Sequence, residues 1–500
     1  MTIYNTKALS KKGLIIFILF SIYISANGQQ NIFSRVFNPY EKNYTYSIAN
    51  ALQLKGNNYI VISVGYDTLV NPKRNIQVCE IDSIGNLIKL TSYGSENSSY
   101  FAGSRGSFIK THDGGYCIAG SKRLYSNYAE EHLILRFNSN MDTLWTKLYN
   151  SGINNEILNQ LCQTSDKGFV CVGEKAYGTD SSDVLLFKTD SSGNFIWKKT
   201  IALGDNFIGT TILETPDKGL LISGYMFSDI EFNKSFVMKT DSIGNLIWYK
   251  ILGSNKINSE SSIAITNQGD YLVAYGYGIA NDNSDSKMEK GRLNIIKYSA
   301  DGYMLWNKIL DSNRAYYSVY KINILSNNDI VVLGSSLGNG INALSPFLFR
   351  LNSYGDSLWR NTIYYSGNTL DNNYLFDDVI NTDGSITACG YVRGDTLVPM
   401  RKIWVVRAYF NNPTNGIEEY YHLSKGEISI FPNPATTQTT ITYPIAEKAI
   451  TLQIYNMLGQ KVYEEKLAKG NSQTTINITG FKPGLYKVVA GESSGTLIIN

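Results

Sequence analysis

The sequence predicts an all-β fold, a seven-bladed β-propeller followed by a small C-terminal immunoglobulin-like β-sandwich. A glycine closes an apolar, strand-like run seven times at intervals of 51–58 residues: Gly65, Gly120, Gly173, Gly224, Gly276, Gly334 and Gly390. A hairpin with the pattern Asp-x-x-Gly-Asn-x-x-Trp follows, most clearly at 190–197 and 241–248. No segment with helical periodicity interrupts the repeat. Each repeat therefore accommodates four short strands, which is typical of one propeller blade.

The two ends of the repeat region predict how the ring closes. The seventh repeat supplies strand-like runs at 374–380, 385–391 and 403–409 but no outer strand. Residues 32–37 (IFSRVF) align with the missing strand. We therefore expect Phe33–Phe37 to complete the seventh blade of a propeller that spans residues 29–410. This pairing would remove an exposed sheet edge.

The N-terminus has the pattern of an export signal. A basic stretch (Lys7–Lys12) precedes an apolar run (Leu14–Ile24) and a small-residue end, which predicts a signal peptide over residues 1–28. The apolar run is too short to cross a bilayer core of about 30 Å. The sequence thus predicts Sec-dependent export and no transmembrane segment.

Charge argues against binding to nucleic acid. The chain carries 45 Lys and Arg against 42 Asp and Glu, and the excess of three lies in the predicted signal peptide. No global field would attract phosphate. With three His, the sequence also predicts no metal centre and no cofactor. A calcium site in the acidic loop 277–292 is left open.

The five cysteines allow one local disulfide. If Asp166-Lys167 is a two-residue turn, Cys162 and Cys171 face each other across a hairpin. A bulged turn that includes Gly168 would place them on opposite faces. Both alternatives remain open at this point.

Longer loops are expected on one face of the ring, where ligand binding is usual. This face carries seven tyrosines: Tyr66, Tyr125, Tyr128, Tyr177, Tyr225, Tyr277 and Tyr391. The favoured interpretation is a non-catalytic binding or adhesion propeller with a glycan or protein ligand. The alternative is a glycan-active enzyme that uses four loop carboxylates: Asp67, Asp180, Asp183 and Asp229. The repeated hairpins are interpreted as mechanical, with Asp bonding its own turn and Trp fastening the outer strand to its neighbour.

The last part of the chain departs from the repeat. Residues 411–427 have the composition of a linker, and residues 428–500 alternate in β fashion. Three segments stand out in this tail: Phe431–Ala435, Ile454–Val462 and Gly484–Tyr486. The tail resembles the type A C-terminal sorting domain of the type IX secretion system of Bacteroidota. It departs from the family at its end, Leu497–Asn500, which lacks the frequent lysines.

The resemblance implies a function for the tail. It implies recognition by the type IX translocon and sortase machinery, followed by secretion or attachment to the outer-membrane surface. The sorting signal would comprise six matching residues: Pro432, Asn433, Pro434, Gly459, Gly484 and Tyr486.

Overall fold

A computed structural model describes residues 29–37, 44–67, 73–95, 97–125, 130–150, 155–177, 181–227, 233–253, 258–277, 291–314, 316–337, 344–363, 372–393, 401–410, 429–431, 435–443, 449–456, 460–471, 473–491 and 493–499. The chain forms two compact units, Met1–Asn415 and Gly416–Asn500. The predicted signal peptide, the linker, Tyr128, Asp180, Asp229 and most of the 277–292 loop lie outside the described residues.

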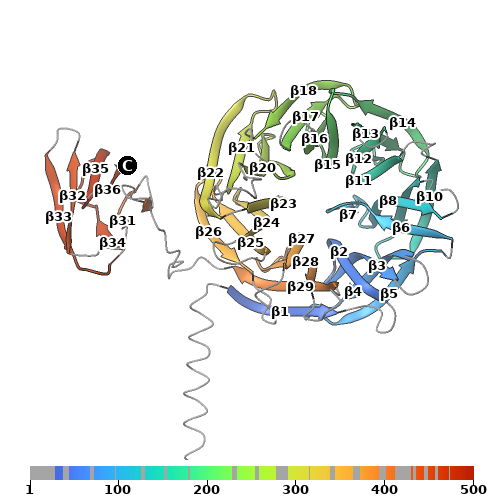
Figure 1. Cartoon of the computed structure of the whole chain (residues 1–500), viewed down its shortest axis with the longest axis horizontal. Coiled ribbons are helices and arrows are strands. Elements are labelled where there is room, and N and C mark those ends of the chain that lie inside the picture. The colour runs from blue at the N-terminus through green and yellow to red at the C-terminus, as the bar shows by residue number, and fades with distance from the viewer. Residues whose placement is uncertain are drawn as a thin grey trace, which may run out of the picture. The chain divides into compact units, whose positions relative to one another are not determined.

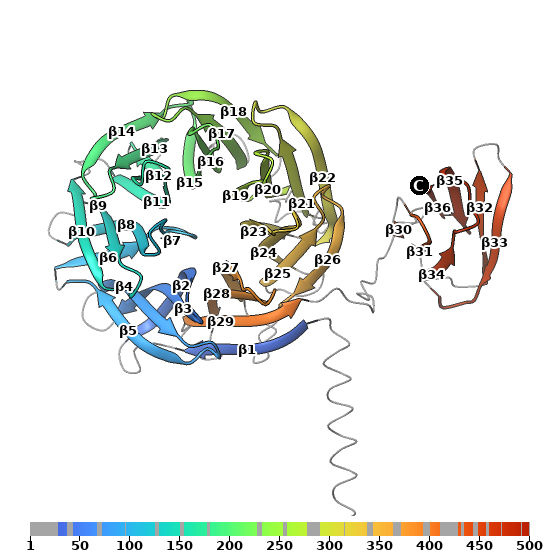
Figure 2. The ribbon, with the colours of Figure 1, turned by 180° about the vertical axis from the view of Figure 1, so that it is seen from behind.

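The larger unit is a ring of antiparallel sheets (Figures 1 and 2). Its inner strands line the cavities of a central channel. The predicted all-β propeller fold is confirmed. From the inner to the outer strand, blades 1 to 3 comprise β2 (Tyr44–Lys55), β3 (Asn58–Asp67), β4 (Lys73–Ile81), β5 (Leu87–Tyr93); β6 (Ser98–Ala102) with β7 (Phe108–Lys110), β8 (Tyr116–Leu124), β9 (Glu130–Phe137), β10 (Thr143–Asn150); and β11 (Asn155–Gln163), β12 (Phe169–Ala176), β13 (Ser182–Thr189), β14 (Phe195–Ile201).

The remaining described strands of this unit continue the same order. Blades 4 to 7 comprise β15 (Asn206–Glu214), β16 (Leu220–Phe227), β17 (Lys234–Thr240), β18 (Leu246–Leu252); β19 (Ser261–Ile265), β20 (Tyr271–Tyr277), β21 (Gly291–Tyr298), β22 (Met304–Arg314); β23 (Tyr316–Ile324), β24 (Ile330–Leu337), β25 (Leu344–Leu351), β26 (Ser357–Thr362); and β27 (Tyr374–Ile380), β28 (Ile386–Arg393), β29 (Arg401–Phe410), β1 (Gln29–Phe37).

The outer strand of blade 7 comes from the N-terminal end of the chain. β1 pairs antiparallel with β29, with Phe33 opposite Arg407 and Phe37 opposite Ile403. Phe33 is buried against Tyr59 of blade 1, with ring centroids 6.3 Å apart. The indole Nε1 of Trp404 donates to the Ser34 hydroxyl at 2.9 Å. Side-chain contacts and a backbone ladder therefore both hold β1.

Neighbouring blades cover both faces of each sheet, so the middle strands are apolar at successive positions. Val61 and Ile62, adjacent on β3, are both fully buried, and Val61 packs in a cluster shared with blade 7 while Ile62 packs with blade 2. Alternate side chains of one strand thus enter two different inter-blade cores. This explains why the sequence shows continuous apolar runs rather than strict alternation.

The repeated outer hairpins have a structural role, as predicted: Asp stabilises the turn and Trp packs against the neighbouring blade. The Asp190 carboxylate accepts hydrogen bonds from the backbone N–H groups of Ser192 and Asn194 at 2.9 and 2.7 Å. Four hairpin tryptophans pack beneath the turn glycine of the next blade: Trp145 under Gly193, Trp197 under Gly244, Trp248 under Gly302 and Trp306 under Gly355. A side chain on any of these glycines would lie within 3.3 Å of the indole ring.

The turn before β12 resolves the disulfide question. Lys167 adopts a φ of 68°, and the Thr164 N–H donates to the Gly168 carbonyl at 2.9 Å. The turn is therefore bulged, and Cys162 lies opposite Val170 while Leu161 lies opposite Cys171. The two cysteines enter different core clusters. All five cysteines are buried and free.

The smaller unit is a two-sheet sandwich. One sheet contains β30 (Ser429–Phe431), β31 (Gln438–Thr442) and β34 (Gln473–Asn477), and the other contains β33 (Lys461–Leu467), β32 (Ile450–Asn456), β35 (Gly484–Ala490) and β36 (Ser493–Ile499). Their inner faces share one apolar core that includes Ile441, Tyr443, Leu452 and Ile454. The Tyr486 hydroxyl donates to the Lys482 carbonyl at 2.6 Å, and Gly484 has a φ of 150°, which favours glycine.

Candidate functional site

A β-bulge interrupts the inner strand of most blades at the same level of the channel. In blade 3, Leu158 lies opposite Gly173 and Gln160 opposite Val172, so Asn159 has no partner across the ladder. A Cβ on Gly173 would lie 1.8 Å from the Ile157 carbonyl oxygen, which explains the glycine. A bulge re-aims one side chain, and bulges are common beside active sites.

The same irregularity recurs in the other blades. Register shifts leave out Asn50, Thr210, Tyr320 and Phe376. In blade 5 the Ser259 N–H bonds to the Gly276 carbonyl while Ser261 faces Tyr275, so Glu260 is left out. In blade 2 a longer insertion between β6 and β7 contains Arg105.

We call these seven residues the bulge ring: Asn50, Arg105, Asn159, Thr210, Glu260, Tyr320 and Phe376. Six of them line one cavity of about 240 Å³. The seventh, Tyr320, contacts Arg105 and Phe376. The turns and glycines of the blades repeat, whereas the members of this ring differ in chemistry. A position that served only the scaffold would be expected to carry similar residues in every repeat.

Three members of the bulge ring serve the scaffold. The Asn50 amide donates to the Gly103 carbonyl at 3.3 Å, and the Asn159 amide donates to the Gly209 carbonyl at 2.9 Å. Both bonds connect one blade to the next. The Thr210 hydroxyl bonds to the Ser223 carbonyl within its own blade. Arg105, Glu260 and the two aromatic residues remain as candidate ligand-contacting groups.

Arg105 and Glu260 form an ion pair across the channel. Arg105 Nη1 lies 3.0 Å from Glu260 Oε2, with 29% and 37% of the two side chains exposed. The Arg105 guanidinium also lies over the Tyr320 and Phe376 rings, 4.0 and 4.8 Å from their centroids. Two aromatic faces and one carboxylate thus fix the orientation of this cation.

A second carboxylate, Glu174 of β12, lines the same cavity. Burial and the nearby Glu130 carboxylate raise the pKa of Glu174 above its ordinary value. Burial also raises the pKa of Tyr225, and the charges of Glu260 and Glu174 add to this rise. The cavity therefore combines one carboxyl group biased toward its protonated form with one carboxylate paired to a guanidinium.

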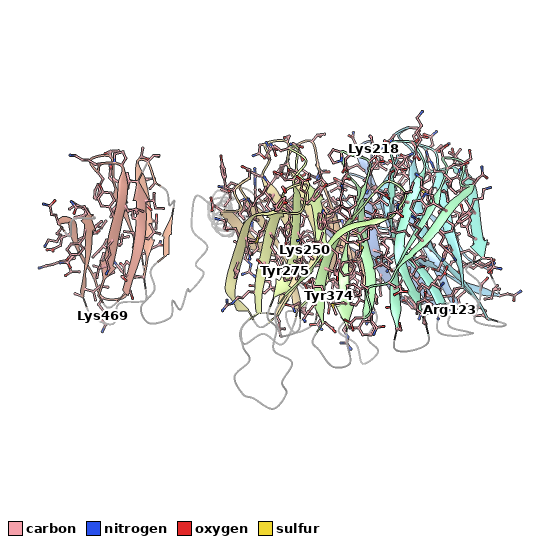
Figure 3. All side chains as sticks on the ribbon, turned by 90° about the horizontal axis from the view of Figure 1, so that it is seen from above. Arg123, Lys218, Lys250, Tyr275, Tyr374 and Lys469 are labelled. Atoms are coloured by element: carbon pink, nitrogen blue, oxygen red, sulfur yellow. The ribbon has the colours of Figure 1, made fainter. Side chains whose placement is uncertain are left out.

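Aromatic side chains of blade 7 form the adjoining wall. The Tyr374 ring stacks on Phe376 at 5.6 Å and lies 4.9 Å from the ring of Tyr391. The Arg401 guanidinium lies 5.1 Å from the centroid of Tyr391. Figure 3 shows Tyr374 and Arg123 near one face of the ring and Lys218, in a short turn, near the opposite face.

Ion pairs recur within blades on the short-turn face. Lys188 pairs with Asp166 at 2.9 Å, and Lys239 pairs with Asp217 at 2.5 Å. Although burial opposes it, hydrogen bonds from Lys239 and Thr215 lower the pKa of Asp217 to about 2. These repeated pairs belong to the scaffold.

A larger cavity of about 700 Å³ occupies the rest of the channel toward that face. Its polar side chains connect blades. The side-chain Oε1 of Gln160 accepts from the Ile212 N–H at 2.8 Å, and the Glu214 carboxylate accepts from the Ser165 N–H at 2.9 Å. At the blade 6–7 junction, Lys321 Nζ lies 2.6 Å from the Asp377 carboxylate. This cavity adjoins the candidate site through Arg105 and Phe376.

The structure separates the seven predicted tyrosines. Tyr225 lines the candidate cavity, and Tyr391 lies in the adjoining aromatic wall, largely buried. Tyr66 lies under Arg74, and the Tyr125 hydroxyl bonds to Ser99 at 3.0 Å. Tyr177 is exposed beside Lys175. The side chains of Tyr128 and Tyr277 lie outside the described residues, as do those of Asp67, Asp180 and Asp229.

Sequence reasoning missed Arg105, Glu174 and Glu260. A signal was available for two of them, because the bulge ring lies 14 to 16 residues before each strand-closing glycine. Reading that position in the repeats gives Asn, Arg, Asn, Thr, Glu, Tyr and Phe. Of the predicted sorting residues, Gly484 and Tyr486 are placed as above, and Pro432, Asn433, Pro434 and Gly459 lie outside the described part of the tail.

Two features are absent from the described residues. In this part of the chain, no cluster of three or more His, Cys, Asp or Glu could hold a metal ion. No helix of sufficient length and hydropathy to cross a membrane occurs there.

Comparison with known proteins adds three solved structures. A polysaccharide lyase (an ulvan lyase of family PL25) has 10% sequence identity and a TM-score of 0.46, over 74% of this chain and 95% of that one. The α-L-arabinanase of Penicillium chrysogenum has 9% identity and a TM-score of 0.38, over 76% and 98%. The β-propeller domain of the Pyrococcus furiosus trilobed protease has 10% identity and a TM-score of 0.41, over 76% and 99%.

These findings correct the favoured sequence interpretation. The expected non-catalytic binding propeller is contradicted, since two of these three similar structures are glycan-active enzymes. No curated protein matches the sequence.

Residues 429–499 match the secretion system C-terminal sorting domain family. The match agrees with the resemblance expected from the tail motifs, and such a domain implies export. The chain is thus an all-β protein with a propeller, and its tail is a type IX secretion system sorting domain.

Proposed function

We propose that this protein is an exported, glycan-active propeller enzyme whose site is the cavity at the bulge ring. The observation that carries the proposal is the meeting of the Arg105–Glu260 ion pair with Glu174 in one cavity. The usual acid and base of glycoside cleavage are two carboxyl groups in different environments, and here burial raises the pKa of Glu174. The acid and base are thus Glu174 and Glu260 of the channel, and not the four loop carboxylates expected from the sequence.

The proposed reaction is hydrolysis of a glycosidic bond. Glu174, protonated, donates its proton to the leaving glycosidic oxygen as the bond to the anomeric carbon breaks. Glu260, ionised, accepts a proton from the water whose oxygen bonds to that carbon. Arg105 is a positioning residue, because it holds the Glu260 carboxylate at 3.0 Å. The aromatic rings beside it offer flat apolar faces to a sugar.

The test is product release from polysaccharides by the full chain. We expect new reducing ends from at least one polysaccharide in a panel of neutral and acidic glycans. Absorbance of an unsaturated uronate in the product would instead indicate β-elimination, and hydrolysis would then be the wrong reaction class. Binding without any product across the panel would contradict enzymatic function.

The tail is proposed to deliver the propeller to the cell surface or the medium after removal of a signal peptide over residues 1–28. A chain truncated after Asn415, where the larger unit ends, should accumulate inside the outer membrane. The reason is that the sorting domain at 429–499 is then absent. Cell fractionation with protease accessibility measures this. Surface exposure of the truncated chain at the full-length level would contradict the sorting role.

A further inference from the structure

A second cavity, of about 300 Å³, lies beside the candidate site. Ser104 and Asn159 line both cavities, so a glycan chain in the first can extend toward the second. Arg74, at the start of β4, and Arg123, near the end of β8, form its outer part. Both ends face the long-loop side of the ring, where Figure 3 places Arg123.

Arg74 is held by aromatic rings rather than by a carboxylate. Its guanidinium carbon lies 4.6 Å from the Tyr66 ring centroid and 4.7 Å from that of Phe101. No carboxylate within the described ranges pairs with it. The rings fix its position but leave its charge unneutralised and its N–H donors available.

The other charged lining groups cancel each other. Arg123 Nε donates to Glu130 Oε1 at 2.6 Å, and these two are the remaining charged residues among those that line the cavity. The net charge of the lining is therefore that of Arg74, positive. Ser121, a residue that is 4% exposed, adds a buried hydroxyl that has no hydrogen-bond partner among the described residues. A buried, unsatisfied hydroxyl beside an unpaired guanidinium fits an anionic oxygen ligand.

We propose that this second cavity binds a carboxylate or sulfate group on a sugar unit next to the cleaved bond, so that the substrate is an acidic glycan. The inference rests on the proposed function, since it assigns the neighbouring subsite of the same chain of sugars. Arg74 supplies the charge and the forked donors, and Ser121 supplies a further donor. Carboxylate and sulfate share this recognition chemistry and are separated by the test.

The test measures binding of the full chain to three probes: polygalacturonate, a sulfated galactan without uronate, and neutral arabinan. We expect at least one anionic polymer to bind more tightly than arabinan, with affinity that falls as salt rises. Arg74→Gln should weaken that binding about tenfold to a hundredfold, and Arg74→Lys less. Preference for polygalacturonate identifies a carboxylate, and preference for the galactan identifies sulfate.

Arg292→Gln is the matched control, because Arg292 is exposed on β21 and lines neither cavity. It should leave the binding unchanged, and melting curves should show that every variant folds. Equal binding to all three probes, binding to none, or indifference to Arg74→Gln overturns the inference. Cleavage of a neutral glycan with no role for Arg74 overturns it while supporting the enzyme. Arg74-dependent anion binding without any cleavage supports the anion-binding inference and contradicts the proposed enzymatic function.

Discussion

Deletion of residues 29–38 is expected to lower the melting temperature by about 5–10 °C and to cause aggregation. Phe33 is buried, and Val36 and Phe37 are half-buried against the blade 7 cores. Losing these contacts corresponds to roughly 4–8 kcal/mol. An unfolding entropy of about 2 cal/mol/K per residue converts this into the stated shift. The deletion also leaves β29, with fully buried Trp404 and Val405, as an open edge.

Two controls separate closure from simple truncation. Removing the sorting unit, which has its own core, should leave the melting of the propeller nearly unchanged. Within β1, Phe33→Ala should destabilise far more than Ile32→Ala, because Ile32 is already 37% exposed. Calorimetry and light scattering report both effects. Equal shifts for the two truncations would show that β1 does not hold the ring together.

Glu260→Gln is expected to reduce turnover of a responsive glycan by about 10²- to 10⁴-fold, the range of one acid–base group. The amide keeps the size of the side chain but cannot accept a proton. Glu174→Gln should cause a loss of similar size and also change the pH profile. The raised pKa of Glu174 keeps its proton available to higher pH than in a free glutamic acid, and activity falls as pH rises through that pKa. The Gln variant should lack this alkaline limb.

Glu214→Gln is the matched control for both variants. Glu214 lies in the same channel but bonds to Ser165 near the short-turn face, outside the 240 Å³ cavity. It should retain wild-type turnover in the same assay. If Glu214→Gln and Glu260→Gln lose activity equally, the damage is to the scaffold and the assignment of the site is wrong.

The fold could be predicted because its signals are local. Gly193 and Trp197 mark one outer hairpin, and the same spacing at Gly244 and Trp248 marks the next. Turn chemistry and apolar runs recur in every blade, so each copy reinforces the interpretation of the others. The turn at Lys167 had two possible forms, a two-residue Asp166-Lys167 turn and a bulged turn that includes Gly168. The sequence is compatible with both, and only the ladder register distinguishes them.

The site could not be predicted in the same way. Glu260 and Arg105 are 155 positions apart. They meet only because each blade contributes one residue at this level of the channel, from a bulge, an insertion or the start of its inner strand. A bulge is a property of pairing between two strands, and a one-residue shift is invisible in an apolar run. The number of tyrosines in the long loops predicted a binding site on the loop face. In the structure, however, Tyr66 contacts Arg74, and Tyr391 packs against its aromatic neighbour Tyr374.

The pairing of β1 with β29 also fixes when the propeller can finish folding. Ser34 and Trp404 are 370 positions apart, so their contact has one of the longest sequence separations in the ring. The entropy lost on closing a loop grows with its length, and long-range pairings form late. In a chain that emerges N-terminus first, β1 stays unpaired until β29 of blade 7 has emerged. The first strand to be made is therefore the last to be paired, and the propeller acquires its full stability only after the whole repeat region has been delivered.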